Sequence, residues 1–423
     1  MSLLKKSSIR ILSITAQRPD STGSGVYLTQ LVRALDKKGY EQAVIAGIEN
    51  KDTILFPAQV KFYPVRFETE TLPFPIVGMS DEMPYPSTRY RDLTPKMVQQ
   101  YREAFRLVLE KAVEEFDPEL ILCHHLYLLT AMVRELFPEK KVYGFCHNTD
   151  LMQMKNTDLE RVYIAKEIRK LDRIFVLRED QIPEIEAIYG AQKERILPIG
   201  TGYNKEVFFS GKRTNKDDSE EMPSDTNQGA IILVFTGKLT QRKGLLSLLR
   251  ALSYLSVEPG KLRLICAGAT GNEVEYQAVR ALADASPYEV VFYGMLDEKK
   301  LADVLREGDI FVLPSFYEGI PISVIEALAC GNRVILTELP GLRAWFSKYI
   351  SGAPISYVPY PAESEPEKKK ELPAFERELA KVIEKEIATV KNRKLNGESE
   401  EGAIPDLSCV TWEGVAKRVL HSS

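Results

Sequence analysis

The chain has 423 residues, 44% of them hydrophobic and 27% charged, and a formal net charge of −4. These values are typical of a globular protein with two or three domains, and the weak charge gives no overall attraction to nucleic acid or acidic membranes. No apolar run is long enough for a transmembrane helix, and no signal-peptide core precedes the first apolar strand. Five scattered Cys indicate reduced thiols, so we expect a cytoplasmic protein, with peripheral membrane contact left open.

Apolar strands and amphipathic helices alternate along the first half of the chain. A strand at 10–16, a helix at 26–38 and a strand at 41–47 form a βαβ unit, which requires parallel strands. More strands are expected at 120–123, 142–146, 173–177 and 195–199. The pattern predicts a doubly wound, Rossmann-like α/β domain over residues 1–205.

One long stretch of this domain, residues 61–95, holds six aromatic residues and six prolines and shows no clear period. Long irregular stretches inside a domain are often functional. Two interpretations are open: a lid over the acceptor side of the protein, or an ordered surface loop packed on its own aromatic side chains.

A polar stretch at 210–229 is typical of a linker, and a second series of elements follows it. Its strands are expected at 231–236, 262–267, 290–293, 310–313, 334–337 and 355–358, which predicts a second doubly wound domain over 206–407. A helix at 373–390 lies in a highly charged segment, and a last helix near 410–420 carries Trp412, Val415, Val419 and Leu420 on one side. Ligands of such sheets bind beyond the carboxyl ends of the strands, so two facing domains would form a cleft.

The segment from Asp309 to Gly341 is the most informative part of the second series. A buried strand leads into a short loop with Glu318, and a helix over 321–330 follows with Pro321 suited to its first position. Glu326 stands on that otherwise apolar helix, where a carboxylate is costly without a partner. The helix start favours an anion, and the two Glu favour hydroxyl groups, which together fit a nucleotide-sugar.

Two further loops carry candidate anion-binding groups. In Gly237–Gly244 a strand is followed by Lys238 and Lys243 and then by a helix expected at 245–255, so two cations flank helix N–H groups. In Thr22–Gly25 the residues Gly23, Ser24 and Gly25 precede a helix start, where glycine lets the backbone approach a phosphate or an acceptor.

Three of the four His, at positions 124, 125 and 147, follow predicted strand ends. His147 and Asn148 come after one strand, and His125 after another. A zinc site made by the three His is one alternative. Filling of the interdomain surface is another, and for His124 it is the preferred interpretation.

The segment from Glu318 through Gly331 resembles the E-G-x-P-x-x-x-x-E-A-x-A-x-G pattern of retaining nucleotide-sugar glycosyltransferases of family four, whose fold is GT-B. The chain departs at Asn332 and Arg333, where a small residue and Pro are usual, and at Lys238, where Arg is usual. The other motifs extend the resemblance weakly over nearly the whole chain. It also implies that the terminal helix, about 408–423, packs back on the first domain.

The resemblance implies a role for each matched residue. Lys243, assisted by Lys238, would contact the donor diphosphate opposite the glycine-rich loop at Gly25. Glu326 would bind the ribose, Glu318 and the backbone from Gly319 through Ile320 and Pro321 to Ile322 would hold the sugar, and Met295 with Leu296 would contact the base. His147 would lie near the transferred sugar and the reaction centre, and the acceptor side would be formed by Gly23, Ser24, His125 and Asn148.

The expected activity is therefore transfer of a hexose-like sugar from a nucleoside diphosphate to a sugar, lipid-linked or small-molecule acceptor, with retention. Catalysis would use His147, Lys243 and Glu318, with no metal, no other cofactor and no nucleic acid partner. Two alternatives remain: a nucleotide-sugar epimerase of the same architecture, and a non-catalytic nucleotide-sugar-binding protein.

Overall fold

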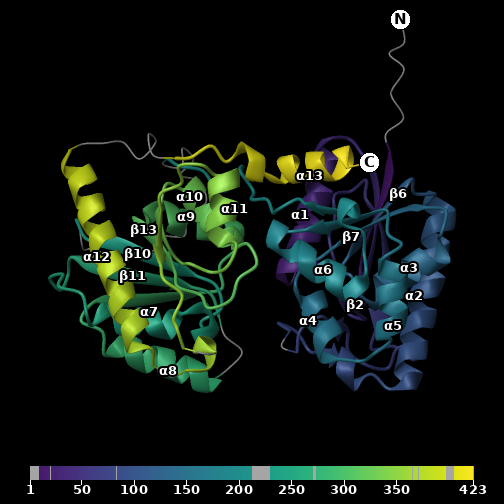
Figure 1. Cartoon of the computed structure of the whole chain (residues 1–423), viewed down its shortest axis with the longest axis horizontal. Helices are drawn as coiled ribbons and strands as arrows, with labels where there is room; N and C mark the ends of the chain where they lie inside the picture. Colours follow the sequence, from purple (N-terminus) through teal and green to yellow (C-terminus); the bar gives the residue numbers. More distant parts are fainter. Residues whose placement is uncertain are drawn as a thin grey trace, which may run out of the picture. The chain divides into compact units, whose positions relative to one another are not determined.

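The computed structural model describes residues 9–19, 21–81, 83–211, 229–269, 273–363, 365–369, 371–396 and 404–422. The chain forms two compact units, one of residues 1–202 with 412–423 and the other of residues 203–411. Figure 1 shows both units as sheets flanked by helices. Most of the predicted linker at 210–229 lies outside the described residues, as does the end of the charged segment after 396.

The first unit is built on a seven-stranded parallel sheet of order β3-β2-β1-β6-β7-β8-β9. Its strands are β1 (Arg10–Thr15), β2 (Glu41–Glu49), β3 (Lys61–Phe67), β6 (Leu120–His124), β7 (Lys141–Phe145), β8 (Arg173–Val176) and β9 (Ile196–Pro198). The helices are α1 (Gly23–Lys37), α2 (Pro95–Phe116), α3 (Leu128–Leu136), α4 (Thr149–Asn156), α5 (Arg161–Ile168) and α6 (Ile182–Tyr189). A small pair, β4 (Val77–Gly78) with β5 (Thr88–Arg89), completes it.

The second unit holds a six-stranded parallel sheet of order β12-β11-β10-β13-β14-β15. Its strands are β10 (Ile231–Thr236), β11 (Leu262–Ala267), β12 (Glu289–Gly294), β13 (Ile310–Leu313), β14 (Arg333–Thr337) and β15 (Ile355–Val358). The helices are α7 (Leu245–Leu252), α8 (Glu273–Asp284), α9 (Glu298–Glu307), α10 (Ile322–Ala329), α11 (Leu342–Tyr349) and α12 (Pro373–Leu395), and α12 packs along α7.

Central strands of both sheets are apolar without alternation because helices cover both of their faces. In β10, for example, Leu233, Val234 and Phe235 are all fully buried. Strand directions and strand orders match the expected doubly wound α/β class in both units, so this prediction is confirmed.

The stretch at 61–95 is more ordered than its composition predicts. Residues 61–67 form β3, the edge strand of the first sheet, where Pro64 is tolerated because an edge strand has a side that needs no N–H donor. Phe67, Phe74 and Tyr90 are buried in the core of the unit, with the Phe67 and Phe74 rings 5.9 Å apart. The interpretation of 61–95 as one irregular segment is therefore wrong, and its aromatic side chains pack inward.

The last helix, α13 (Trp412–His421), belongs to the first unit and lies beside α1. The Trp412 ring meets Tyr27 edge to face with centroids 4.9 Å apart, and a Cβ on Gly202 would lie 2.6 Å from the same indole. Arg418 donates two hydrogen bonds to the carbonyl of Ile199 at 2.9 and 2.7 Å. These contacts fix the helix on its unit.

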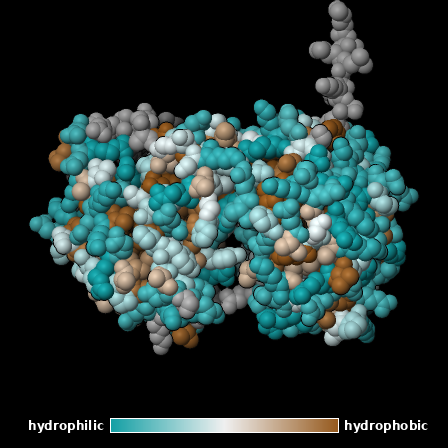
Figure 2. Space-filling model, viewed as in Figure 1, coloured by the Kyte–Doolittle hydropathy of each residue, from teal (hydrophilic) through white to brown (hydrophobic). Residues whose placement is uncertain are grey.

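The visible surface is mostly hydrophilic, with hydrophobic residues scattered over it singly or in small groups (Figure 2). Scattered apolar side chains are normal on a globular protein and mark no particular site. Among the described residues, no helix is both long and apolar enough to cross a membrane. All five Cys are free, and four of them are buried.

Candidate active site

The predicted site residues lie at the carboxyl ends of parallel strands, beside the point where strand order reverses. In the first unit this point is between β1 and β6, which lead to the loops at Gly23 and His125. In the second it is between β10 and β13, which lead to Lys238 and Glu318. Loops on either side of such a point diverge and leave a crevice that binds ligands in doubly wound folds.

The loop after β10 is a tight turn that ends at Gly244. Thr240 accepts a hydrogen bond from the Lys243 amide, and Gly244 caps α7 with φ 76°. A Cβ on Gly244 would lie 2.0 Å from the carbonyl oxygen of Pro314, so only glycine fits against the β13 loop. Lys238 is exposed, and Lys243 is partly buried, with 28% of its side chain exposed. The turn thus holds Lys243 against the neighbouring strand end.

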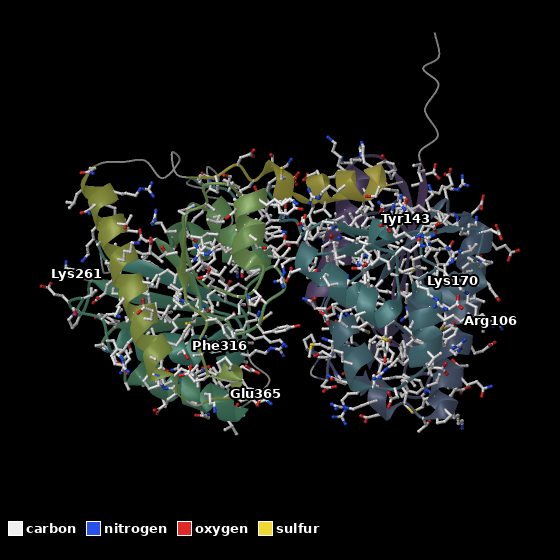
Figure 3. All side chains as sticks on the ribbon, in the orientation of Figure 1. Arg106, Tyr143, Lys170, Lys261, Phe316 and Glu365 are labelled. Atoms are coloured by element: carbon white, nitrogen blue, oxygen red, sulfur yellow. The ribbon has the colours of Figure 1, made fainter. Side chains whose placement is uncertain are left out.

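Lys243 and Glu318 form an ion pair across these two strand ends. The Lys243 Nζ lies 2.6 Å from Glu318 Oε1, to which Ser315 Oγ also donates at 2.7 Å. The loop is anchored by Phe316, which is labelled in Figure 3. Its amide donates to the Arg242 carbonyl at 3.0 Å, and its ring centroid lies 5.2 Å from that of Phe375. The sequence placed the two groups in separate motifs, and the fold brings them together.

The α10 helix starts one residue later than predicted, because Pro321 is its N-cap with ψ 104°. The preceding backbone, Gly319 and Ile320, leads directly to that helix start, and Ile322 is half-buried as its first residue. The Glu326 side chain is half-buried, and no other described residue binds its carboxylate. Burial, and secondarily the negative charge of Glu298, raise the pKa of Glu326 to about 8.

The end of β12 supplies little side-chain chemistry. Gly294 has φ 67° and accepts a hydrogen bond from the Gly268 amide at 2.7 Å. Met295 follows with 78% exposure, and Leu296 is half-buried. An exposed Met at a strand end offers an apolar contact, and its contact with a base stays a prediction.

In the first unit, Gly23, Ser24 and Gly25 form the first turn of α1 and not a loop before it. The prediction placed the helix start at Val26, but Thr22 is the N-cap and accepts a hydrogen bond from the Gly25 amide at 3.1 Å. A Cβ on Gly25 would lie 2.8 Å from the Arg18 carbonyl oxygen, so the preceding loop folds closely over this turn.

Gln17 organises this site, although no sequence motif indicated it. Its Nε2 donates to Thr22 Oγ1 at 3.0 Å and to Ser24 Oγ at 2.8 Å, and it lies 3.3 Å from His125 Nε2. Its Oε1 accepts from the Met79 amide at 3.3 Å. A buried amide with these partners ties the first turn of α1 to the end of β6. Only the fold brings these partners together, so no motif could have found them.

The three His lie together, but their ring nitrogens do not converge on one point. His125 Nε2 is 2.9 Å from Ser24 Oγ, whereas His124 Nδ1 is 3.1 Å from His147 Nε2. Within the described part of the chain, no group of three or more His, Cys, Asp or Glu is arranged to hold a metal ion. Burial lowers the pKa of His147 to about 3 and lowers those of His124 and His125, so all three rings are neutral at neutral pH.

Two residues at these strand ends have left-handed backbones: His125 with φ 73° and Asn148 with φ 69°. Such conformations often occur at functional sites, where the surroundings enforce them. Asp150 supports the second turn by accepting from the amides of His147 at 3.1 Å and Leu126 at 2.9 Å. The side-chain oxygen of Asn148 accepts a hydrogen bond from Gln181.

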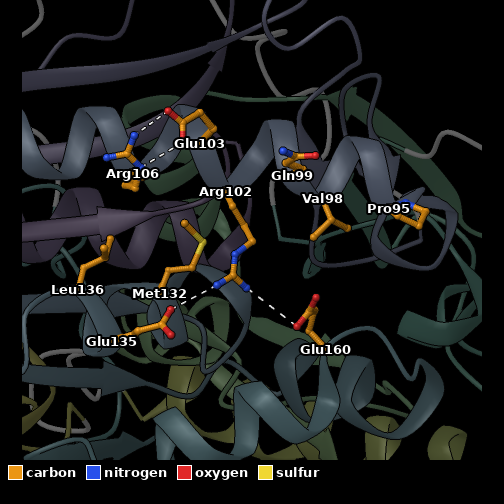
Figure 4. Close-up of a pocket in the computed structure, with 10 residues that line it drawn as sticks. All are labelled: Pro95, Val98, Gln99, Arg102, Glu103, Arg106, Met132, Glu135, Leu136 and Glu160. Atoms are coloured by element: carbon orange, nitrogen blue, oxygen red, sulfur yellow. Dashed lines mark hydrogen bonds and ion pairs between the residues drawn. The ribbon is translucent and has the colours of Figure 1, made fainter.

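A pocket of the first unit, of about 410 Å³, lies elsewhere, between α2, α3 and the start of α5 (Figure 4). At its centre Arg102 lies between Glu135 at 3.3 Å and Glu160 at 4.0 Å, while Arg106 pairs with Glu103 at 2.7 Å. These charges compensate one another, and none of the predicted site residues lines the pocket. The strand ends are therefore the better candidate site.

Comparison with known proteins gives a family match within the second unit. The family of group 1 glycosyl transferases matches residues 230–357, a range that includes Lys238, Lys243, Glu318 and Glu326. Among curated relatives, D-inositol 3-phosphate glycosyltransferase 2 of Catenulispora acidiphila is 28% identical over 181 residues, or 40% of this chain and 41% of that protein. Alpha-maltose-1-phosphate synthase of Mycolicibacterium smegmatis is 25% identical over 235 residues, 54% of this chain and 56% of its own.

Solved structures match over the full length at low identity. Sucrose-phosphate synthase of Thermosynechococcus elongatus has a TM-score of 0.68 with 17% identity, covering 98% of both chains. Anabaena HepE, solved in complex with UDP-glucose, has a TM-score of 0.62 with 13% identity, covering 98% of this chain and 99% of its own. The chain therefore has the GT-B fold of these proteins. Within its second unit, residues 230–357 match the group 1 glycosyl transferases.

Proposed function

We propose that this protein transfers a sugar from a nucleoside-diphosphate sugar to an acceptor, with retention of anomeric configuration. The observation that carries the proposal is the convergence of Lys243, Glu318 and the α10 helix start at the strand ends of the second unit. The family match covers these residues. Because the chain spans only about two fifths of the length of the first curated relatives, activity, donor and acceptor are all part of the proposal.

In this proposal the second unit holds the donor. Lys243, with Lys238, binds the diphosphate, and Glu326 binds the ribose hydroxyls. Glu318 and the backbone from Gly319 to Ile322 bind the sugar. Met295 and Leu296 lie beside the base. Such a site recognises the phosphates by charge and the sugar by hydrogen bonds, and a nucleotide-sugar contains both kinds of group.

The first unit supplies the acceptor-side groups in this proposal: Gly23, Ser24, His125 and Asn148, with Gly25 turned toward the donor phosphates. His147 orients the transferred sugar. Charge grows on the leaving diphosphate as the glycosidic bond breaks, and fixed cations stabilise it more in the transition state than in the ground state. Lys243 and the helix starts can do this without a divalent ion.

A hexose donor is the proposed specificity, because HepE, which shares the fold, was solved with UDP-glucose. One sequence relative is named as a D-inositol 3-phosphate glycosyltransferase, which favours a small polar acceptor. The proposed acceptor is a sugar or small hydroxyl compound, with a lipid-linked glycan as the second choice. Peripheral membrane contact belongs to that second choice, and no nucleic acid partner is proposed.

The deciding experiment has two stages. Thermal shifts with UDP, GDP and ADP identify the base, and turnover of the matching α-linked sugar donor is then followed by proton NMR of the new anomeric signal. An α-linked product is expected. A β-linked product would overturn retention, epimerised donor without acceptor would identify an epimerase, and nucleotide binding without hydrolysis or transfer would identify a binding protein.

A further inference from the structure

His124, the last residue of β6, is a buried histidine to which the roles assigned above give no function. Its ring is 2% exposed and lies parallel to Phe145, with centroids 4.6 Å apart and an interplanar angle of 3°. The His147 ring is nearly parallel to it, with centroids 5.3 Å apart and an interplanar angle of 13°. If this ring only filled space, a flat apolar ring such as that of Phe would serve equally well. The two nitrogens of His124 therefore need an explanation.

The two nitrogens of His124 have different surroundings. Nδ1 is 3.1 Å from His147 Nε2, within hydrogen-bond distance. Nε2 is buried and has no hydrogen-bond partner among the described residues. One nitrogen is therefore engaged with the proposed sugar-orienting residue, while the other is buried without a hydrogen-bond partner among the described residues.

This difference determines where the single proton of neutral His124 resides. With the proton on Nε2, the ring would bury an N–H that has no acceptor. With the proton on Nδ1, the ring donates to His147 and leaves only an unused lone pair in the interior. Buried N–H groups without a partner are rarer in proteins than acceptors with a free lone pair, so the second arrangement is favoured.

The same argument then fixes the state of His147. If its Nε2 accepts from His124, the proton of this neutral ring must be on Nδ1. His147 is half-buried, and its Nδ1 makes no hydrogen bond with any other residue that the structure describes. The nitrogen that remains for a ligand is thus an N–H donor.

We propose that His124 is a positioning residue, which donates its Nδ1–H to His147 Nε2 and holds His147 with its proton on Nδ1, facing a ligand oxygen. The role of this donor rests on the proposed function, in which the oxygen belongs to a hydroxyl of the transferred sugar. A histidine that presents N–H cannot accept a proton at that atom. The arrangement therefore makes His147 an orienting group and not a general base for inverting attack.

The protein is well suited to a direct measurement of this tautomer, since it contains only four His. Long-range proton–nitrogen correlation spectra of the full chain with ¹⁵N-labelled His distinguish protonated from bare ring nitrogens, and single substitutions assign the four rings. His147 is expected to show a protonated Nδ1 and a bare Nε2. A protonated Nε2 on His147 in the wild-type protein overturns the proposal.

Substitution tests the positioning role. His124→Phe keeps the stacked ring and removes the donor, so His147 should become a mixture of tautomers and kcat should fall about tenfold, with KM for the donor unchanged. His124→Asn, which keeps an N–H near the Nδ1 position, should restore part of kcat. The exposed His421, which contacts only the Lys417 carbonyl, gives the control His421→Phe with no expected change.

The outcomes separate this inference from the proposed function. If His124→Phe is folded and alters neither the His147 tautomer nor kcat, the positioning role is wrong even though transfer occurs. If no donor is turned over, the proposed function fails, while the spectrum of the wild-type protein still decides which nitrogen of His147 carries the proton.

Discussion

Lys243 Nζ and Glu318 Oε1 lie 2.6 Å apart, although 75 residues separate them in the chain. The cation that we assign to the diphosphate and the carboxylate that we assign to the sugar thus bind each other. In the proposed function, a diphosphate would compete with Glu318 for Lys243, and the displaced carboxylate would become available to sugar hydroxyls. We therefore expect binding of the two parts of the donor to be coupled through this pair.

The first prediction concerns the diphosphate. Lys243→Ala should remove most of the thermal stabilisation by a nucleoside diphosphate, because a charge-assisted hydrogen bond of about 1.5–3 kcal/mol is lost. Arg242→Ala is the matched control, since Arg242 is exposed and its guanidinium lies over the Tyr317 ring at 4.5 Å. An undiminished shift in Lys243→Ala would show that the phosphate binds elsewhere.

A second prediction separates the two Glu. Glu318→Gln removes the competitor for Lys243 and should tighten binding of a free nucleoside diphosphate by about 1.4-fold to fivefold, since partly exposed ion pairs contribute about 0.2–1 kcal/mol. The same variant should lose transfer activity. Glu326→Ala should weaken binding of the free nucleotide, because the proposed ribose contact is lost. Titration calorimetry measures both, and equal effects of the two substitutions would contradict the separate roles.

The third prediction uses the raised pKa of Glu326, about 8 against a usual 4.5. Folded protein holds this proton over a pH range where unfolded protein has released it. The stability contributed by the group is therefore complete below about pH 4.5 and falls as pH rises toward 8. Glu326→Gln mimics the protonated form, so its stability advantage over wild type should grow across that range.

Chemical denaturation at about pH 5 and about pH 9 measures this difference. The exposed Glu258→Gln is the control and should follow wild type at both values. A flat difference between Glu326→Gln and wild type would mean that the carboxylate is already ionised in the folded protein.

The fourth prediction compares two glycines of the second unit that share a left-handed backbone. Gly244 has φ 76° and Gly260 has φ 81°, but only at Gly244 would a Cβ meet another atom, the Pro314 carbonyl oxygen at 2.0 Å. Gly260→Ala should lower the free energy of unfolding by about 1–2 kcal/mol through backbone strain alone. Gly244→Ala should lower the free energy of unfolding clearly more and should also displace Lys243. Similar urea midpoints for the two variants would argue against a rigid turn.

The fifth prediction concerns metal. Nucleotide binding and transfer should persist in EDTA, because Lys243, Lys238 and the helix starts supply the positive charge for the diphosphate. The activity of EDTA-treated protein, with and without added manganese or magnesium, measures this directly. Loss of activity that a divalent ion restores would show that the charge is supplied differently.

The elements themselves were largely predictable from the sequence. Each central strand is a short apolar run that fits burial on both faces, and the end of β13, Glu318 and α10 follow one another locally in the chain. Boundaries moved by a few residues where a side chain caps a helix, as Thr22 does for α1. The missed strand β3 contains Pro64, which suits a strand only at an edge, and edge position is a property of the sheet.

What only the tertiary structure decided are the pairings between strand ends. Gln17 with His125, His124 with His147 and Lys243 with Glu318 are each brought together by the parallel order of the strands and the packing of the helices on them. Local periodicity records which face of an element is buried, and it carries no information about which neighbour lies beside it. The sequence therefore determined the class of fold and indicated the candidate site residues. The sheet order determined which of those residues meet and, through burial, which of them hold a proton.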